Sequence, residues 1–259
     1  MSATFATRLL GWKNSPKSDG KPKNILGWAH VPNCADVASA ESMRLAGSML
    51  DNLGTARGIL SDVPQHPGGP LEQFVTEDLA VALPRRAPER CWSVRRGQII
   101  TSFAQYEHLS ELDRLVSANP DLRITIGRDY LIKPDVAIGL ENPSILGKKP
   151  FLHAAISCKW TIRSDRVQNI RHEFNQMIRH RRGRQPHLVT VTAEPLPSRL
   201  ASIARGTGEV DAVYHIALEA LAAAIDADGN DEQAEAWDEC IGQKRLLSYD
   251  ALVETIASW

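Results

Sequence analysis

The apolar run at residues 151–158, FLHAAISC, most constrains how this chain can fold. Lysines and a proline precede it and a charged tetrad follows it, so it crosses a core between two solvated ends. A short apolar run bounded in this way is typical of a buried strand. Because side chains alternate across a strand, Ser157 and the following Lys159 point to one face and Cys158 points to the other.

A second strand is expected at residues 134–140, which begin Pro-Asp-Val-Ala-Ile. Proline suits the first position of a strand because its missing N–H costs little there. Asp135 then lies on the face opposite Val136 and Ile138. If the two strands pair, Asp135 and Lys159 meet at one edge of the sheet.

A helix is expected over about residues 165–180, with Ser164 or Asp165 capping its N-terminus. Apolar residues recur along it at helical spacing, at Ile170, Phe174, Met177 and Ile178. Glu173 borders this inward stripe, where an acid is costly unless it meets a cation or a metal. We therefore expect Glu173 to have such a partner.

Asp135, Lys159 and Glu173 together suit phosphodiester hydrolysis. Hard carboxylate oxygens match Mg²⁺, which keeps several waters and also binds substrate phosphate. We expect Asp135, the backbone carbonyl of Cys158 and Glu173 as metal ligands, the last directly or through water. Lys159 would hold the attacking water or stabilise the pentavalent phosphate.

The tetrad at residues 163–166, Arg-Ser-Asp-Arg, suits the reading of G·C pairs. Arginine donates two parallel bonds to guanine, and aspartate accepts from the cytosine amine. Arg163, Asp165 and Arg166 could therefore read adjacent pairs in a major groove. A cutting site and a reading site fall within one short segment.

Residues 157–166, SCKWTIRSDR, together with Glu173, resemble the active-site and recognition segment of type II restriction endonucleases of the NgoMIV group. These belong to the PD-(D/E)xK superfamily and recognise sites with a CCGG core. Asp135 matches the family's catalytic aspartate, and Glu72 resembles an additional acid on an N-terminal helix. The resemblance spans roughly residues 26 to 216.

The resemblance also accounts for Ser157, which stands where the wider superfamily has an acid. The NgoMIV group makes the same change and supplies the acid from the helix, as Glu173 would. It implies Mg²⁺ as cofactor, 5′-phosphate ends, a role in restriction–modification, and a homotetramer built from two dimers. Its inner CCGG readers match Arg163, Asp165 and Arg166.

Three further positions fall where NgoMIV-like members place additional base contacts: Asp36, Gln65 and Arg199. They point to GCCGGC as the complete site.

Each feature also has a plainer interpretation. A Pro-Asp pair often just starts a strand, the tetrad could be a solvated helix N-terminus, Glu72 could favour a helix dipole, and Arg199 could support a loop. Two other function classes stay open. A repair or structure-specific nuclease would share the catalytic residues without needing the tetrad, and a non-cutting DNA-binding protein would not need the catalytic residues.

Charge and composition restrict the remaining classes. The net charge of −1 means that a DNA binder must segregate its charge, as the arginine-rich segment 159–184 and the acidic segment 226–239 do. The cysteines form no CxxC pair, which argues against zinc and disulfide frameworks. The sequence contains no GxxxxGK[ST] loop, so a nucleotide cofactor is not expected. Without a spanning apolar run or signal-peptide core, a cytoplasmic location is expected.

The expected architecture is α/β, a mixed central β-sheet flanked by helices, restriction-endonuclease-like. Residues 1–24 suggest a flexible or partner-bound arm, and residues 25–259 a single endonuclease domain. Further strands are expected near 122–127 and 188–192. Further helices are expected at 36–53, 71–83, 103–117, 211–225 and 248–257.

Overall fold

The computed structural model describes residues 2–141, 148–206 and 208–259, with the side chains of 164–166 left out. Its main feature is a six-stranded sheet in the order β10-β9-β8-β7-β6-β5. The strands are β5 (Cys91–Arg96), β6 (Val136–Glu141), β7 (Phe151–Lys159), β8 (His187–Thr192), β9 (Ala212–His215) and β10 (Leu246–Ser248). Strands β5, β6 and β7 pair antiparallel, whereas β7 to β10 pair parallel. The sheet is therefore mixed, as expected.

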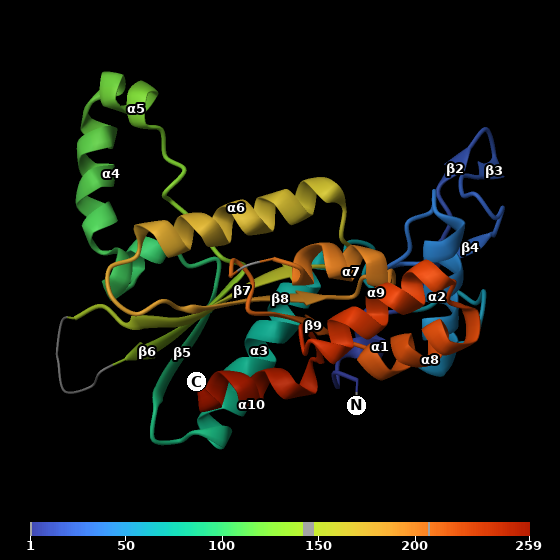
Figure 1. The fold of residues 1–259 in the computed structure, drawn as a ribbon. Coiled ribbons are helices and arrows are strands. Elements are labelled where there is room, and N and C mark those ends of the chain that lie inside the picture. Colours follow the sequence, from blue (N-terminus) through green and yellow to red (C-terminus); the bar gives the residue numbers. More distant parts are fainter. Residues whose placement is uncertain (1, 142–147, 207) are drawn as a thin grey trace.

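Helices cover both faces of this sheet (Figure 1). Helix α6 (Ser164–His180) lies over one face with α7 (Pro197–Ala204) beside it, and α3 (Gly68–Arg86) and α10 (Asp250–Ser258) lie on the other. Strand β7 is buried over residues 152–158 because it sits between these layers. The apolar stripe of α6 packs inward through Ile170, Phe174 and Met177. The α/β class is thereby confirmed.

The remaining elements surround this core. Helix α2 (Ala40–Asn52) packs against α8 (Leu218–Asp228), and α9 (Asp231–Gly242) packs against α7. Helices α4 (His108–Ala118) and α5 (Pro120–Ile126) project from the body (Figure 1). Short elements complete the chain: α1 (Ala6–Leu9), the pair β1 (Trp12–Asn14) and β4 (His30–Pro32), the hairpin β2 (Lys17–Ser18) and β3 (Lys21–Pro22), and two 3₁₀ turns, η1 (Ile100–Ser102) and η2 (Ala104–Tyr106). No helix in the described ranges has the length and apolarity to cross a membrane.

Two expected elements are wrong. Residues 122–127 do not form a strand, because Asn119 caps a helix that starts at Pro120 and its side chain accepts the N–H groups of Asp121 and Leu122. The expected helix at 211–225 divides into β9 and α8, because residues 212–215 pair with β8. The two edge strands, β5 and β10, had no expected counterpart.

The N-terminal segment differs from the arm that its composition suggested. Phe5, Leu9 and Trp12 are buried in the main core, and Phe5 stacks on Phe74 of α3 with 5.5 Å between ring centroids. Residues 17–18 and 21–22 form the exposed hairpin. The apolar residues before this hairpin therefore pack against the rest of the chain, and the division of the chain at residue 25 stays a prediction.

Candidate active site

Asp135 gathers three donors from the end of β7. Its Oδ2 lies 2.8 Å from Lys159 Nζ and 2.7 Å from the backbone nitrogen of Cys158, and Ser157 Oγ donates to it over 3.4 Å. The antiparallel pairing of β6 with β7 brings them together, since Val136 stands opposite Ile156. The expected meeting of Asp135 and Lys159 at a sheet edge is thus confirmed. Both side chains keep 23% exposure, so solvent and substrate can reach them.

Glu173 reaches this place from α6. Burial raises the pKa of its carboxyl group, and the negative charge of Asp135 adds to the rise, while Lys159 and His172 lower it. A carboxyl group that is desolvated beside a second acid favours proton or cation binding. Lys159 supplies a positive charge near Glu173, and the metal partner of Glu173 stays a prediction.

Glu72 approaches from α3. Its Oε2 accepts a hydrogen bond of 2.8 Å from Arg96 Nη2, at the end of β5. Burial is the main reason that the pKa of the Cys158 thiol is raised. The negative charges of Asp135 and Glu72 raise this pKa further, and the positive charge of Arg96 lowers it. Glu72 therefore lies close to the same strand end as Asp135. Arg96 was not anticipated, because β5 itself was not.

The donor set fits a hard divalent cation. Within the described residues, no three His, Cys, Asp or Glu side chains converge as a ready-made metal cage. Mg²⁺ does not need one, since it is commonly held by one or two carboxylates together with waters and phosphate. Asp135 and the desolvated Glu173 are the candidates for that pair of carboxylates.

A second constellation lies where α6 begins. Arg199 Nη2 on α7 donates to Asp36 Oδ2 over 2.6 Å, and Arg199 Nη1 donates to the Ile162 carbonyl over 3.4 Å. The bond from Arg199 is the main reason that the pKa of Asp36 is lowered, and Arg163 adds to the effect. Three of the expected base-reading residues are therefore neighbours.

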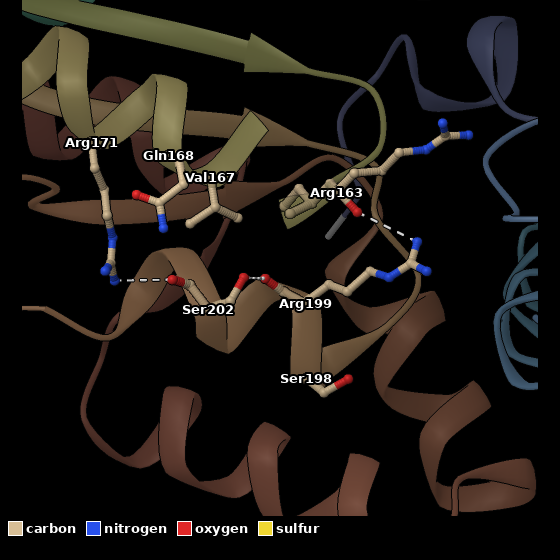
Figure 2. Close-up of a pocket in the computed structure, with 8 residues that line it drawn as sticks. Arg163, Val167, Gln168, Arg171, Ser198, Arg199 and Ser202 are labelled. Atoms are coloured by element: carbon tan, nitrogen blue, oxygen red, sulfur yellow. Dashed lines mark hydrogen bonds between the residues drawn. The ribbon is translucent and has the colours of Figure 1, made fainter. Parts of the chain in front are cut away.

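Two hollows flank these residues, each of about 470 Å³. One lies between α6 and α7, where the side chains of Arg163 and Arg199 extend to the same side, away from Arg171 (Figure 2). The other is lined by both Lys159 and Arg163, and Gln65 also borders it. The residues expected to cut and to read DNA thus share one continuous region of surface.

The tetrad itself is described only in part. Helix α6 begins at Ser164, so its N-cap is Arg163 and not Ser164 or Asp165; the expected cap is corrected by one residue. Arg163 at this position has extended backbone angles, which place it before the first turn. The side chains of Asp165 and Arg166 lie outside the described residues.

Glu194 is a buried acid that the sequence did not reveal. It follows β8 and is 0% exposed. Its Oε2 accepts the Ile162 N–H over 2.7 Å, and its Oε1 accepts the Leu196 N–H over 3.2 Å. Arg199 Nη1 lies 3.9 Å from Oε1. Burial raises the pKa of Glu194 to about 7, against the lowering by these N–H groups and Arg199.

The chain is similar to known restriction enzymes. A family model described as the NgoMIV restriction enzyme matches residues 19–145 and 140–253. The type II restriction enzyme NgoMIV of Neisseria gonorrhoeae is 41% identical over 247 residues, which cover 83% of this chain and 86% of that protein. A crystal structure of the pre-specific restriction endonuclease BsaWI with DNA matches with a TM-score of 0.33 and 16% identity, covering 70% of this chain and 65% of that one.

Proposed function

The chain belongs to the NgoMIV family of type II restriction enzymes and is a site-specific deoxyribonuclease, and from this premise we propose that it cuts double-stranded DNA at GCCGGC. The proposed reaction is Mg²⁺-dependent hydrolysis of one phosphodiester bond in each strand, leaving 5′-phosphate ends. The observation that carries the proposal is the convergence on Asp135 of Lys159, Ser157 and the Cys158 N–H, with Glu173 close by.

Asp135 and Glu173 would hold Mg²⁺ together with the Cys158 carbonyl. The N–H and C=O of one strand residue project to the same side of the strand. Because the Cys158 N–H points to Asp135, its carbonyl is directed to the same edge. When bound, Mg²⁺ supplies activation of water and neutralisation of charge at the phosphate.

Lys159 is proposed to stabilise the negative charge that develops on the phosphate. Its ammonium group is held by Asp135 before substrate arrives, so little reorganisation is needed at the moment of reaction. Ser157 is 2% exposed and donates to the same oxygen, which fixes the orientation of the carboxylate. Glu72 is proposed as an additional acid, held in place by its hydrogen bond from Arg96.

Recognition is proposed to use the residues around the start of α6. Arg163, Asp165 and Arg166 would read the inner CCGG pairs, and Asp36, Gln65 and Arg199 the outer ones. The Asp36–Arg199 pair supports this division, since one acceptor and one forked donor lie together as a G·C pair requires. Each well-formed bidentate contact discriminates by about 1–3 kcal/mol.

We further propose a homotetramer of two dimers acting on DNA in the cytoplasm, as part of a restriction–modification system. One core cluster runs from Ala3 to Ala257, which supports a single endonuclease domain over residues 25–259 with the N-terminal residues packed onto it.

Digestion of a sequenced plasmid tests the proposal. Purified protein should give discrete fragments with Mg²⁺ and none with EDTA, and sequencing of the ends should place every cut within GCCGGC. The Asp135→Asn variant serves as the control for contaminating nucleases. Ends at another CCGG-containing sequence would correct the outer bases, whereas random nicking would contradict site-specific cleavage.

A further inference from the structure

The carboxylate of Glu194 joins the two elements that carry the base-reading arginines. Oε2 accepts the N–H of Ile162, the residue immediately before Arg163. Oε1 lies 3.9 Å from Arg199 on α7 and accepts the N–H of Leu196, directly before that helix. A single buried side chain therefore sets the distance between the start of α6 and the start of α7.

Glu194 is itself firmly held. Its backbone N–H donates to Thr192 Oγ1 over 3.2 Å, and its carbonyl oxygen lies 3.1 Å from Nε2 of the buried His215. Nδ1 of His215 accepts the Ala217 N–H, so Nε2 carries the proton and donates to Glu194. Thr192 on β8 and His215 on β9 thus hold the backbone of Glu194, from which the carboxylate extends.

Charge gives Glu194 a second role. Arg199 faces two carboxylates, Asp36 at 2.6 Å and Glu194 at 3.9 Å. Asp36 keeps 22% side-chain exposure, whereas the Glu194 side chain has none. Asp36 can therefore turn towards a base, and Glu194, which is ionised above its pKa of about 7, then stays behind as the counter-ion of Arg199. A guanidinium group left without such a partner in a desolvated interface would be costly.

We propose that Glu194 is a positioning residue for sequence discrimination: it fixes Arg163 through the Ile162 backbone and compensates the charge of Arg199 when Asp36 engages DNA. This inference rests on the proposed function and deepens it, because Glu194 would act at the same recognition surface without touching a base. The hollow between α6 and α7 is the space whose walls it sets (Figure 2).

Glu194→Gln tests the inference. Both carboxylate oxygens accept backbone N–H groups, and an amide can accept with only one of them. Asp211→Asn is the control, since the Asp211 carboxylate accepts the Leu188 N–H over 2.7 Å at the opposite end of β8. For each protein, kcat and KM are measured on GCCGGC duplexes and on duplexes with one inner or outer pair changed, together with thermal stability.

We expect Glu194→Gln to lower the ratio of kcat/KM between the target and the altered duplexes by about tenfold or more. Asp211→Asn keeps an oxygen for the single Leu188 N–H, so it should leave this ratio unchanged. If Glu194→Gln leaves this ratio unchanged, with or without an equal loss of kcat/KM on all duplexes, the residue is only structural and the inference is overturned.

Two further outcomes are distinguishable. If Glu194→Gln does not fold, Glu194→Asp keeps the charge near Arg199 while its shorter side chain loosens the Ile162 bond. Discrimination at the inner pairs should then fall more than at the outer pairs, and unchanged discrimination would overturn the inference. If the wild type cuts no site with Mg²⁺, the proposed function itself fails and the inference fails with it.

Discussion

Replacing Lys159 by methionine should remove cleavage while leaving recognition in place. The substitution replaces the ammonium group that lies 2.8 Å from Asp135 Oδ2 with an apolar chain of similar length. Loss of one preorganised electrostatic contact to a transition state typically lowers a rate by about 100- to 1000-fold. We expect a loss of at least that size in the rate of the cleavage step.

Folding should suffer far less. Asp135 keeps its bonds from Cys158 and Ser157, and the lost ion pair is 23% exposed on both sides. The free energy of unfolding should therefore decrease by only about 1 kcal/mol. If urea titrations give this value, the variant is folded under assay conditions, and unfolding does not explain the loss of cleavage.

The decisive assay is single-turnover cleavage of a short duplex with enzyme in excess, because product release cannot then hide the chemical step. Binding of the same duplex is measured without Mg²⁺. Lys149→Met is the control, since this lysine donates to the Thr101 carbonyl at the other end of β7. A Lys159→Met enzyme that binds normally and cuts within about tenfold of the wild type would refute the role of the ammonium group.

Three further predictions concern other parts of the molecule. Arg166→Ala should weaken binding to the target much more than binding to unrelated DNA, and equal losses in a competition assay would place Arg166 on phosphate instead. Asp135→Asn should abolish Mg²⁺-dependent cleavage, whereas Glu72→Gln should reduce it by a smaller factor because Glu72 already pairs with Arg96; equal rates in the two variants would contradict this order. Burial lowers the pKa of His215 from 6.5 to about 4, so the unfolded chain takes up a proton that the folded state excludes. Stability from His215 should be complete above pH 6.5 and decrease by about 3 kcal/mol as the pH falls to 4, and a pH series of urea titrations should show this dependence in the wild type but not in His215→Gln.

Local pattern was enough to place the centre of the fold. Residues 134–140 and 151–158 carried their own strand signals, so side-chain alternation brought Asp135 and Lys159 together once the two strands were assumed to pair, and the structure shows this pairing. Glu173 followed in the same way from the apolar stripe of α6. In each case the deciding contacts lie within one strand pair or one helix.

Features that depend on distant residues were not predictable in this way. A separate miss was local: residues 122–126 have the β-branched pattern of a strand, but they are exposed, and the cap at Asn119 before Pro120 makes them helical. Nothing around Glu194 in the sequence indicates that its carboxylate is buried, because its partners Ile162 and Arg199 come from the segment before α6 and from α7. Arg96 was missed since an edge strand takes its identity from the neighbour with which it pairs.

Three residues separate Lys159, which ends β7, from Arg163, at the start of α6 that also carries Glu173. The segment 159–173 should therefore function only as a unit, with its strand end, its recognition residues and its helix taken from the same protein. Chimeric enzymes assembled from relatives should remain active when this segment is exchanged whole. They should lose activity when the crossover falls inside it. Glu173 would then come from the α6 of one enzyme and Lys159 from the β7 of another, so the two side chains would no longer be matched.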